Sequence, residues 1–209
     1  MVVILPAAPG ADPFPAIVTQ RLLLRCVSEQ DADSLAALMT ERISLRLASW
    51  PKAMSPRMAL DRIQGAREAA WDGRSVPLVL ESRQDGALIG WFAASRTPDT
   101  APVVLLTYWL GEAFHGLGLM REAAPAALAL ALDVLGPCRV RAAVQADNDA
   151  SLSVVRQLGM HPLGPGRIWC AARGREEDCQ WFDLAAADAA GVVATHARAE
   201  AVSDDRLRQ

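Results

Sequence analysis

Hydrophobic residues recur with two different periods along the chain, and these periods predict strands and helices in a definite order. Short apolar runs typical of strands lie at 21–27, 76–82, 87–95, 101–110, 138–146, 160–164 and 178–186. Segments with apolar residues at helical spacing lie at 28–39 and 55–71, from a glycine turn to about residue 135, and at 147–159. This order favours one mixed α+β sheet, in which a hairpin supplies antiparallel pairs and a strand–helix–strand unit supplies a parallel pair.

Capping and turn residues set several boundaries of these elements. Ser55-Pro56 predicts a helix start, because serine is a good cap and proline is tolerated at the first helical position. We expect that helix to end at Trp71, before "DGR". Asp85-Gly86 between two apolar runs predicts a hairpin turn. Pro125, inside the helix after the glycine turn, removes one hydrogen bond and predicts a kink or a loosened turn.

The two ends of the chain differ in composition from its middle. Residues 1–15 are rich in proline, alanine and glycine, and they predict an irregular N-terminal arm. Residues 186–209 have little apolar periodicity, which predicts a flexible or partly helical tail. We therefore expect a single ordered domain over residues 16–185.

Composition narrows the classes of protein and partner. The 209 residues are 52% hydrophobic, which is enough for one sizeable core, and the formal net charge of −3 gives no reason to expect nucleic acid as a partner. No apolar run reaches the length of a membrane span. Four scattered cysteines without C-x-x-C, and three histidines without ligand spacing, argue against a disulfide framework and a metal site. We expect a reducing, cytoplasmic compartment.

The stretch "YWLGEAFHGLGLMREA", residues 108–123, carries the main chemical signal. Gly116 and Gly118 stand just before a helix, where unpaired N–H groups and the helix dipole bind anions such as phosphate. A Walker A loop is excluded because its lysine and hydroxyl are missing. A dinucleotide fingerprint is excluded because Arg121 stands where the third glycine belongs. The alternative is a plain left-handed turn that binds nothing.

Four segments in series give this turn a context, namely "TQRLLLR" with "DADSL", "ALIGW", "TYWLGEAFHGLGLMREA" and "ADNDASLSVVRQLGM". With them the sequence resembles the GNAT superfamily of N-acetyltransferases, most closely its ribosomal-protein N-terminal (alanine/serine) acetyltransferase branch. The resemblance covers about residues 19–184. It implies the acyl-CoA N-acyltransferase fold, a mixed and mostly antiparallel central sheet with helices on both faces and strands that splay apart at the cofactor site. It also implies acetyl-CoA as the cosubstrate.

The resemblance implies which residues bind acetyl-CoA. The end of the strand before the turn would bond the pantetheine, and the family pattern [QR]-x-x-G-x-[GA] falls on residues 115–120, whose N–H groups would hold the pyrophosphate. The implied set is Trp109, Leu110, His115, Gly116, Leu117, Gly118, Leu119, Met120, Arg121 and Asn148. His115 and Met120 depart from the pattern, and we expect Met120 to narrow the approach to the turn.

The resemblance also implies two catalytic residues at the start of the next helix, Asn148 and Ser151. The serine would lie near the thiolate leaving group, where a hydroxyl can donate a hydrogen bond or a proton. The alternative is that Asn148 only caps the helix and Ser151 is an ordinary first-turn residue. Many relatives use a tyrosine further along this helix. The only tyrosine here, Tyr108, lies on the preceding strand, so we expect that group to be missing.

The group that accepts the amine proton stays open. Where relatives often have glutamate, this chain has Leu105. Glu81, Glu112 and a chain of water molecules are the remaining candidates, and each carboxylate has an alternative as an ordinary surface charge.

We expect an active N-acetyltransferase that moves the acetyl group to a primary amine by direct attack, with a protein N-terminus as one candidate acceptor. Other peptides, amino acids, polyamines and aminoglycosides remain open. Ala48–Pro56 and Gly164–Asp178 would line the acceptor pocket, Trp50 and Trp169 would be its walls or packing residues, and residues 173–178 would be a solvated charged loop.

Two other classes of function compete with the enzyme. The first is a CoA-binding sensor or scaffold without catalysis, and the second is a globular interaction protein that binds no CoA. The sheet edges and the apolar composition also predict a homodimer.

Overall fold

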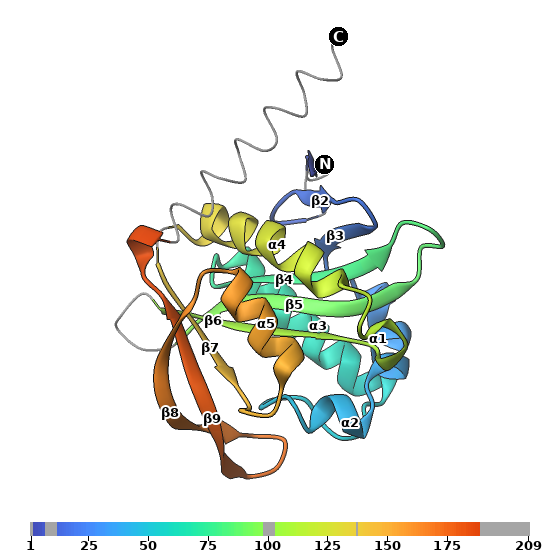
Figure 1. Ribbon diagram of the computed structural model, residues 1–209. Coiled ribbons are helices and arrows are strands. Elements are labelled where there is room, and N and C mark those ends of the chain that lie inside the picture. The colour runs from blue at the N-terminus through green and yellow to red at the C-terminus, as the bar shows by residue number, and fades with distance from the viewer. Residues whose placement is uncertain (1, 7–11, 98–102, 137, 189–209) are drawn as a thin grey trace.

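The computed structural model describes residues 2–6, 12–97, 103–136 and 138–188, which form one sheet with helices on both of its faces (Figure 1). In this part of the chain the sheet has nine strands in the order β1-β2-β3-β4-β5-β6-β7-β9-β8. Every neighbouring pair is antiparallel except β6 and β7. The strands are β1 (Val3–Leu5), β2 (Ala16–Val18), β3 (Leu22–Cys26), β4 (Ser75–Ser82), β5 (Leu88–Arg96), β6 (Val103–Leu110), β7 (Arg139–Val144), β8 (His161–Cys170) and β9 (Arg175–Leu184). The predicted mixed, mostly antiparallel sheet is confirmed.

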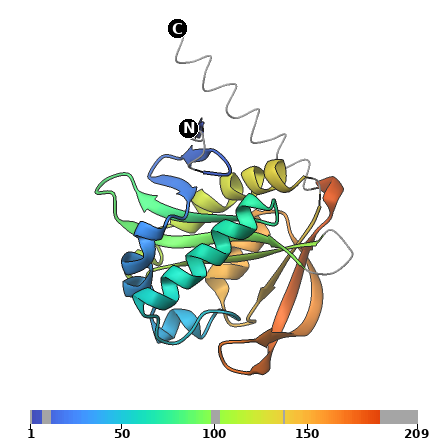
Figure 2. The same cartoon turned by 180° about the vertical axis from the view of Figure 1, so that it is seen from behind.

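The helices divide between the two faces of the sheet, as Figures 1 and 2 show. The first face carries α1 (Ala32–Leu38), α2 (Glu41–Ser44) and α3 (Pro56–Trp71), and the second carries α4 (Leu119–Leu135) and α5 (Asp149–Gln157). Two short 3-10 helices, η1 (Glu29–Asp31) and η2 (Glu112–Phe114), precede α1 and α4. None of the described helices is long and apolar enough to cross a membrane.

The hydrophobic core forms two clusters, one on each face of the sheet. Consecutive strand residues point to opposite faces. Phe92 and Leu106 therefore pack with the α4 side, whereas Trp91 and Trp109, which are odd-numbered residues of the same two strands, pack with the α3 side. This alternation matters for the site, because odd-numbered residues near the end of β6 face α3 and even-numbered ones face α4 and α5.

The boundaries predicted from capping residues are confirmed. The helix α3 runs from Pro56 to Trp71, and the Ser55 hydroxyl accepts a hydrogen bond from the Met58 N–H at 3.2 Å. The hairpin between β4 and β5 turns at Gly86, whose φ of +73° needs the freedom of glycine.

The region predicted to be an irregular arm contains one short strand, β1. It pairs with β2, which begins just after this region, and β2 joins both to the sheet beside β3. A three-residue strand has too few positions to show periodicity, and it exists because a sheet edge offers it backbone partners. Of the predicted tail, residues 189–209 lie outside the described residues.

The segment Gly164–Asp178 forms a strand hairpin, and of the predicted charged loop 173–178 only residues 173 and 174 lie in its turn. It belongs to β8, β9 and the turn between them. The side chain of Arg173 in this turn is only 6% exposed, and it pairs with Glu177 at 2.7 Å. Arg173 also donates to the carbonyls of Ser44 and Leu47, so the hairpin turn is tied to α2. Within this charged run, Arg173 and Glu177 form a largely buried ion pair, whereas Arg175, Glu176 and Asp178 are exposed.

The helix α4 continues through Pro125. Proline cannot bond the carbonyl four residues earlier, which is that of Arg121. Gln157 of α5 donates its side-chain Nε2–H to this carbonyl at 2.9 Å, and its Oε1 accepts from Arg121 Nε at 3.0 Å. The side chain of α5 thus replaces the bond that Pro125 removes.

Candidate active site

The parallel strands β6 and β7 separate from each other at the place where the site forms. Their last paired residues are Leu105 and Arg141. Beyond this pair, β6 runs to Leu110 paired only with β5, and β7 runs to Val144 paired only with β9. We call the gap between these unpaired ends the wedge. It is the splay expected from the fold, and it lets a bound molecule reach strand backbone from either face of the sheet.

The glycine turn, residues 115–118, follows β6 through η2 and leads into α4. Gly116 and Gly118 have φ of +74° and +72°, and Gly118 is the N-cap of α4. Within the described part of the chain, no acceptor bonds the N–H groups of Gly116, Leu117 and Gly118, and all three residues are exposed. Free donors at the positive end of a long helix form an anion-binding arrangement.

Two residues that sequence reasoning did not assign to the site hold the turn in place. Arg21 donates to the Leu117 carbonyl at 2.9 Å and pairs through Nε with Glu122 of α4 at 2.6 Å. The Thr19 hydroxyl also donates to Glu122 at 2.6 Å. Burial alone would raise the pKa of Glu122, but the hydrogen bonds from Thr19 and Arg21 outweigh it and lower the pKa. Both residues belong to the "TQR" that begins the first resembling segment, and this was the sequence feature that could have indicated their role at the turn.

The two departures from the family pattern have separate structural roles. His115 lies with Nε2 at 2.9 Å from the Leu110 carbonyl, so its ring links the turn to the end of β6. The Leu110 carbonyl is therefore already in contact with the His115 ring. Met120 is buried in the main core cluster. The prediction that Met120 narrows the approach to the turn is wrong, because the first turn of α4 points this side chain inward.

A pair of hydroxyl groups connects β6 to α5 across the wedge. The Tyr108 hydroxyl lies 2.8 Å from the Ser151 hydroxyl. Tyr108 stacks on Phe92 with ring centroids 6.2 Å apart, which fixes the phenol on the α5 side of the sheet. Burial raises the pKa of Tyr108 to about 12, against a smaller lowering by Ser151, so the phenol stays protonated at neutral pH. A tyrosine does reach Ser151, from the strand and not from the helix.

Asn148 occupies the helix-capping position that the sequence offered as an alternative to a catalytic role. It is the N-cap of α5, and its Oδ1 accepts from the Ser151 N–H at 3.2 Å. This bond holds the first turn of α5 and with it the hydroxyl of Ser151.

A family model described as Acetyltransferase (GNAT) domain matches residues 21–161, which is more than half of the chain. The chain belongs to the GNAT acetyltransferase family. Its activity is therefore acetyl-CoA-dependent acyl transfer. No curated protein matches the chain.

Solved structures share the fold of this GNAT domain. A putative ribosomal-protein-serine acetyltransferase from Vibrio cholerae is 24% identical, with a TM-score of 0.67 over 83% of this chain and 99% of that one. The ribosomal-protein-S5-alanine acetyltransferase from Vibrio fischeri is 21% identical, with a TM-score of 0.71 over 83% and 97%. A ribosomal L7/L12 α-N-protein acetyltransferase in complex with coenzyme A is 21% identical, with a TM-score of 0.69 over 90% and 99%.

The residues of this GNAT domain fit acetyl-CoA. The exposed glycine turn offers amide donors to a pyrophosphate, and the wedge offers strand edges to a pantetheine arm. Within the described residues, the buried indole N–H of Trp109 at the wedge has no hydrogen-bond partner. An orphaned buried donor is typical of a site that a ligand or water completes.

The candidate bases are both engaged by other side chains. Glu81 on β4 is two strands away from β6, roughly 10 Å at ordinary strand spacing, and it pairs with Arg25 at 2.9 Å. Glu112 lies two residues after the end of β6, and its carboxylate accepts from the Thr40 hydroxyl at 2.5 Å. Leu105 is the last residue of β6 that pairs with β7.

The two tryptophans predicted near the acceptor differ in position. Trp50 is 1% exposed and contacts Trp109 edge-on with centroids 5.0 Å apart, next to a cavity on the α3 face. Trp169 is 59% exposed on β8 and does not line that cavity. Trp50 thus packs against Trp109 and also lines the cavity.

Proposed function

We propose that this GNAT acetyltransferase moves the acetyl group of acetyl-CoA to a primary amine by direct attack, with Ser151 and Tyr108 on the leaving-group side. The observation that carries the proposal is the Tyr108–Ser151 hydroxyl pair across the wedge. Tyr108 lies beyond Leu105, in the part of β6 that is no longer paired with β7, and this position supports a role at the thioester.

The cofactor-binding roles follow from the free backbone groups. When bound, acetyl-CoA supplies the thioester whose acetyl group is transferred. The N–H groups of Gly116, Leu117, Gly118 and Leu119 hold the pyrophosphate, and the α4 dipole adds to their effect. The strand edge at Trp109 orients the pantetheine arm in the wedge.

The hydroxyl pair stabilises the charge that develops on the departing sulfur. Ser151 donates a hydrogen bond or its proton to this sulfur, and Tyr108 donates to Ser151 in turn. Asn148 acts through Ser151 as a positioning residue, because its side chain caps the helix that carries the serine. Since Glu81 and Glu112 are both engaged, water accepts the proton of the attacking amine.

The acceptor that we propose first is the N-terminal amino group of a protein. Structures with the same fold carry names that describe this reaction, including ribosomal-protein-serine and L7/L12 α-N-protein acetyltransferases. We also propose that the protein works in the cytoplasm, which its four free, buried thiols support.

Acetyl-CoA turnover with a panel of primary amines tests the function. We expect free thiol release that depends on the acceptor, and loss of most of this turnover in Ser151→Ala. Calorimetry should give the same acetyl-CoA affinity for both proteins. The alternative, a CoA-binding sensor without catalysis, is suggested by Leu105 in place of glutamate. It is established instead if acetyl-CoA binds tightly and no amine releases thiol.

A further inference from the structure

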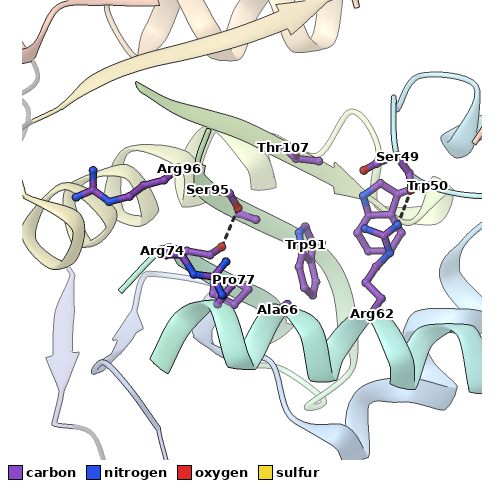
Figure 3. A pocket seen from close by; sticks show the side chains of 13 residues that line it. Ser49, Trp50, Arg62, Ala66, Arg74, Pro77, Trp91, Ser95, Arg96 and Thr107 are labelled. Atoms are coloured by element: carbon purple, nitrogen blue, oxygen red, sulfur yellow. Dashed lines mark hydrogen bonds between the residues drawn. The ribbon is translucent and has the colours of Figure 1, made fainter. Parts of the chain in front are cut away.

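A cavity of about 270 Å³ lies on the α3 face of the sheet, between α3 and strands β5 and β6 (Figure 3). Its walls are aromatic rings, hydroxyl groups and guanidinium groups, among them those of Trp50, Trp91, Thr107 and Arg62. No aspartate or glutamate is among the described residues that line it. The cavity is therefore polar and cationic, and the site described above does not use it.

The cavity borders the wedge from the side opposite to the hydroxyl pair. Thr107 lies two residues beyond Leu105, the last residue of β6 that pairs with β7. Its side chain lines the cavity, whereas the adjacent Tyr108 faces Ser151 on the other side of the sheet. An amine held in the cavity would reach the wedge without crossing the groups that bind the leaving sulfur. This assignment to the acceptor side rests on the proposed function.

Arg62 is an arginine of the cavity lining that has no carboxylate partner among the described residues. Its guanidinium stacks over Trp50 at 4.3 Å from the ring centroid and donates to the Ser49 carbonyl, as Figure 3 shows. No described carboxylate pairs with it. Burial lowers the pKa of Arg62, which shows that its charge is poorly solvated. A partly buried guanidinium without a carboxylate is typical of anion recognition.

The other two arginines around the cavity are already engaged. Arg74 pairs with Asp72 at 2.7 Å. Arg96 turns away from the other labelled side chains in Figure 3 and donates to the Leu135 carbonyl at the end of α4. Neutral hydroxyl groups complete the lining, since Ser75 and Ser95 lie 2.7 Å apart on the cavity wall.

We propose that this cavity binds a carboxylate of the acceptor, with Arg62 as its ion partner, so that the substrate is a primary amine that also carries a carboxylate. The group can come from a free amino acid or short peptide, or from an acidic side chain near a protein N-terminus. The volume lies just below the ~300 Å³ lower end of ordinary ligand pockets, which suits one or two residues. Polyamines and aminoglycosides are poor substrates, because an acid-free cationic cavity repels them.

Matched acceptors test the proposal. One pair is a dipeptide with a free terminal carboxylate and its amide, the second is a peptide beginning Ser-Glu and one beginning Ser-Gln, and spermidine represents polyamines. Thiol release gives KM and kcat, and calorimetry gives affinity for CoA-saturated protein. We expect the carboxylate member of at least one pair to have a KM and Kd about 10- to 100-fold lower, and the pair that does so identifies the source.

Variants separate charge recognition from packing. Arg62→Gln should abolish the preference through KM with kcat for the amide acceptor kept, and Arg62→Lys should keep part of it. Arg57→Gln, the same change on an exposed part of α3, should keep it all. Ala66→Glu adds a carboxylate to the cavity lining and should reverse the preference, which covers the case in which Arg62 variants do not fold.

The outcomes distinguish this inference from the proposed function. If no amine releases thiol but carboxylates bind CoA-saturated protein and Arg62→Gln loses that binding, the function fails and the carboxylate site stands. If thiol is released equally from both members of each pair, or fastest with spermidine, the carboxylate site is overturned and the function stands.

Discussion

Replacing Gly118 by alanine tests whether the turn geometry makes the anion site. A Cβ at Gly118 would have Arg21 Nη2 as its nearest neighbour at 3.8 Å, which is ordinary contact. The cost therefore comes from the backbone alone, because φ of +72° is disfavoured by about 1–2 kcal/mol for a residue with a side chain. If the turn keeps its shape, Tm should fall by about 2–8 °C. If the turn relaxes, its free amides disperse and acetyl-CoA affinity should fall about 5- to 30-fold.

A matched glycine gives the control for this experiment. Gly65 lies inside α3 with open space around its Cβ position and no positive φ. Gly65→Ala should stabilise by about 0.5–1 kcal/mol and leave acetyl-CoA affinity unchanged. Gly118→Asn should cost less than Gly118→Ala, because asparagine tolerates the left-handed region better. Unchanged Tm together with unchanged calorimetric affinity in Gly118→Ala would refute the reasoning.

Three further predictions concern the contacts around the site. Combining Tyr108→Phe with Ser151→Ala should lower kcat by about 100-fold or more without changing acetyl-CoA affinity, and unchanged kcat would remove the pair from the reaction. The lowered pKa of Glu122 means that its contacts stabilise the fold above the unfolded-state pKa near 4.5 and lose this effect as the pH falls through the folded-state pKa. The advantage of wild type over Glu122→Gln in urea unfolding should therefore shrink below about pH 4.5, and a pH-independent advantage would contradict this. Gln157→Ala should cost about 0.5–1.5 kcal/mol in urea unfolding, and less when Pro125→Ala restores a helical N–H for the same carbonyl; an equal cost in both backgrounds would show that the two residues are not coupled.

Several predictions about the site were confirmed or corrected by particular residues. The expected splay of the strands is present beyond Leu105. Asn148 has the capping role that the sequence offered as an alternative, whereas the core position of Met120 was decided by how α4 packs on the sheet. The roles of the site residues in binding and catalysis, and the predicted homodimer, stay predictions.

The amino-acid sequence by itself determined the order of the longer elements from β3 onward, the bounds of α3, the β4–β5 turn and the family. These depend on neighbours within a few positions, such as Ser55 before Pro56 or Asp85 before Gly86, and on segments that keep their order along the chain. Short-range chemistry of this kind is visible in the residues themselves.

Only the tertiary structure decided which distant side chains meet. Tyr108 and Ser151 are 43 positions apart, and Arg21 and Glu122 are 101 positions apart. No local period relates such pairs, because their contact depends on strand register and on how α4 and α5 pack on the sheet. The same holds for Arg62, whose helical spacing places it on α3 but does not show that the cavity beside Trp50 has no carboxylate.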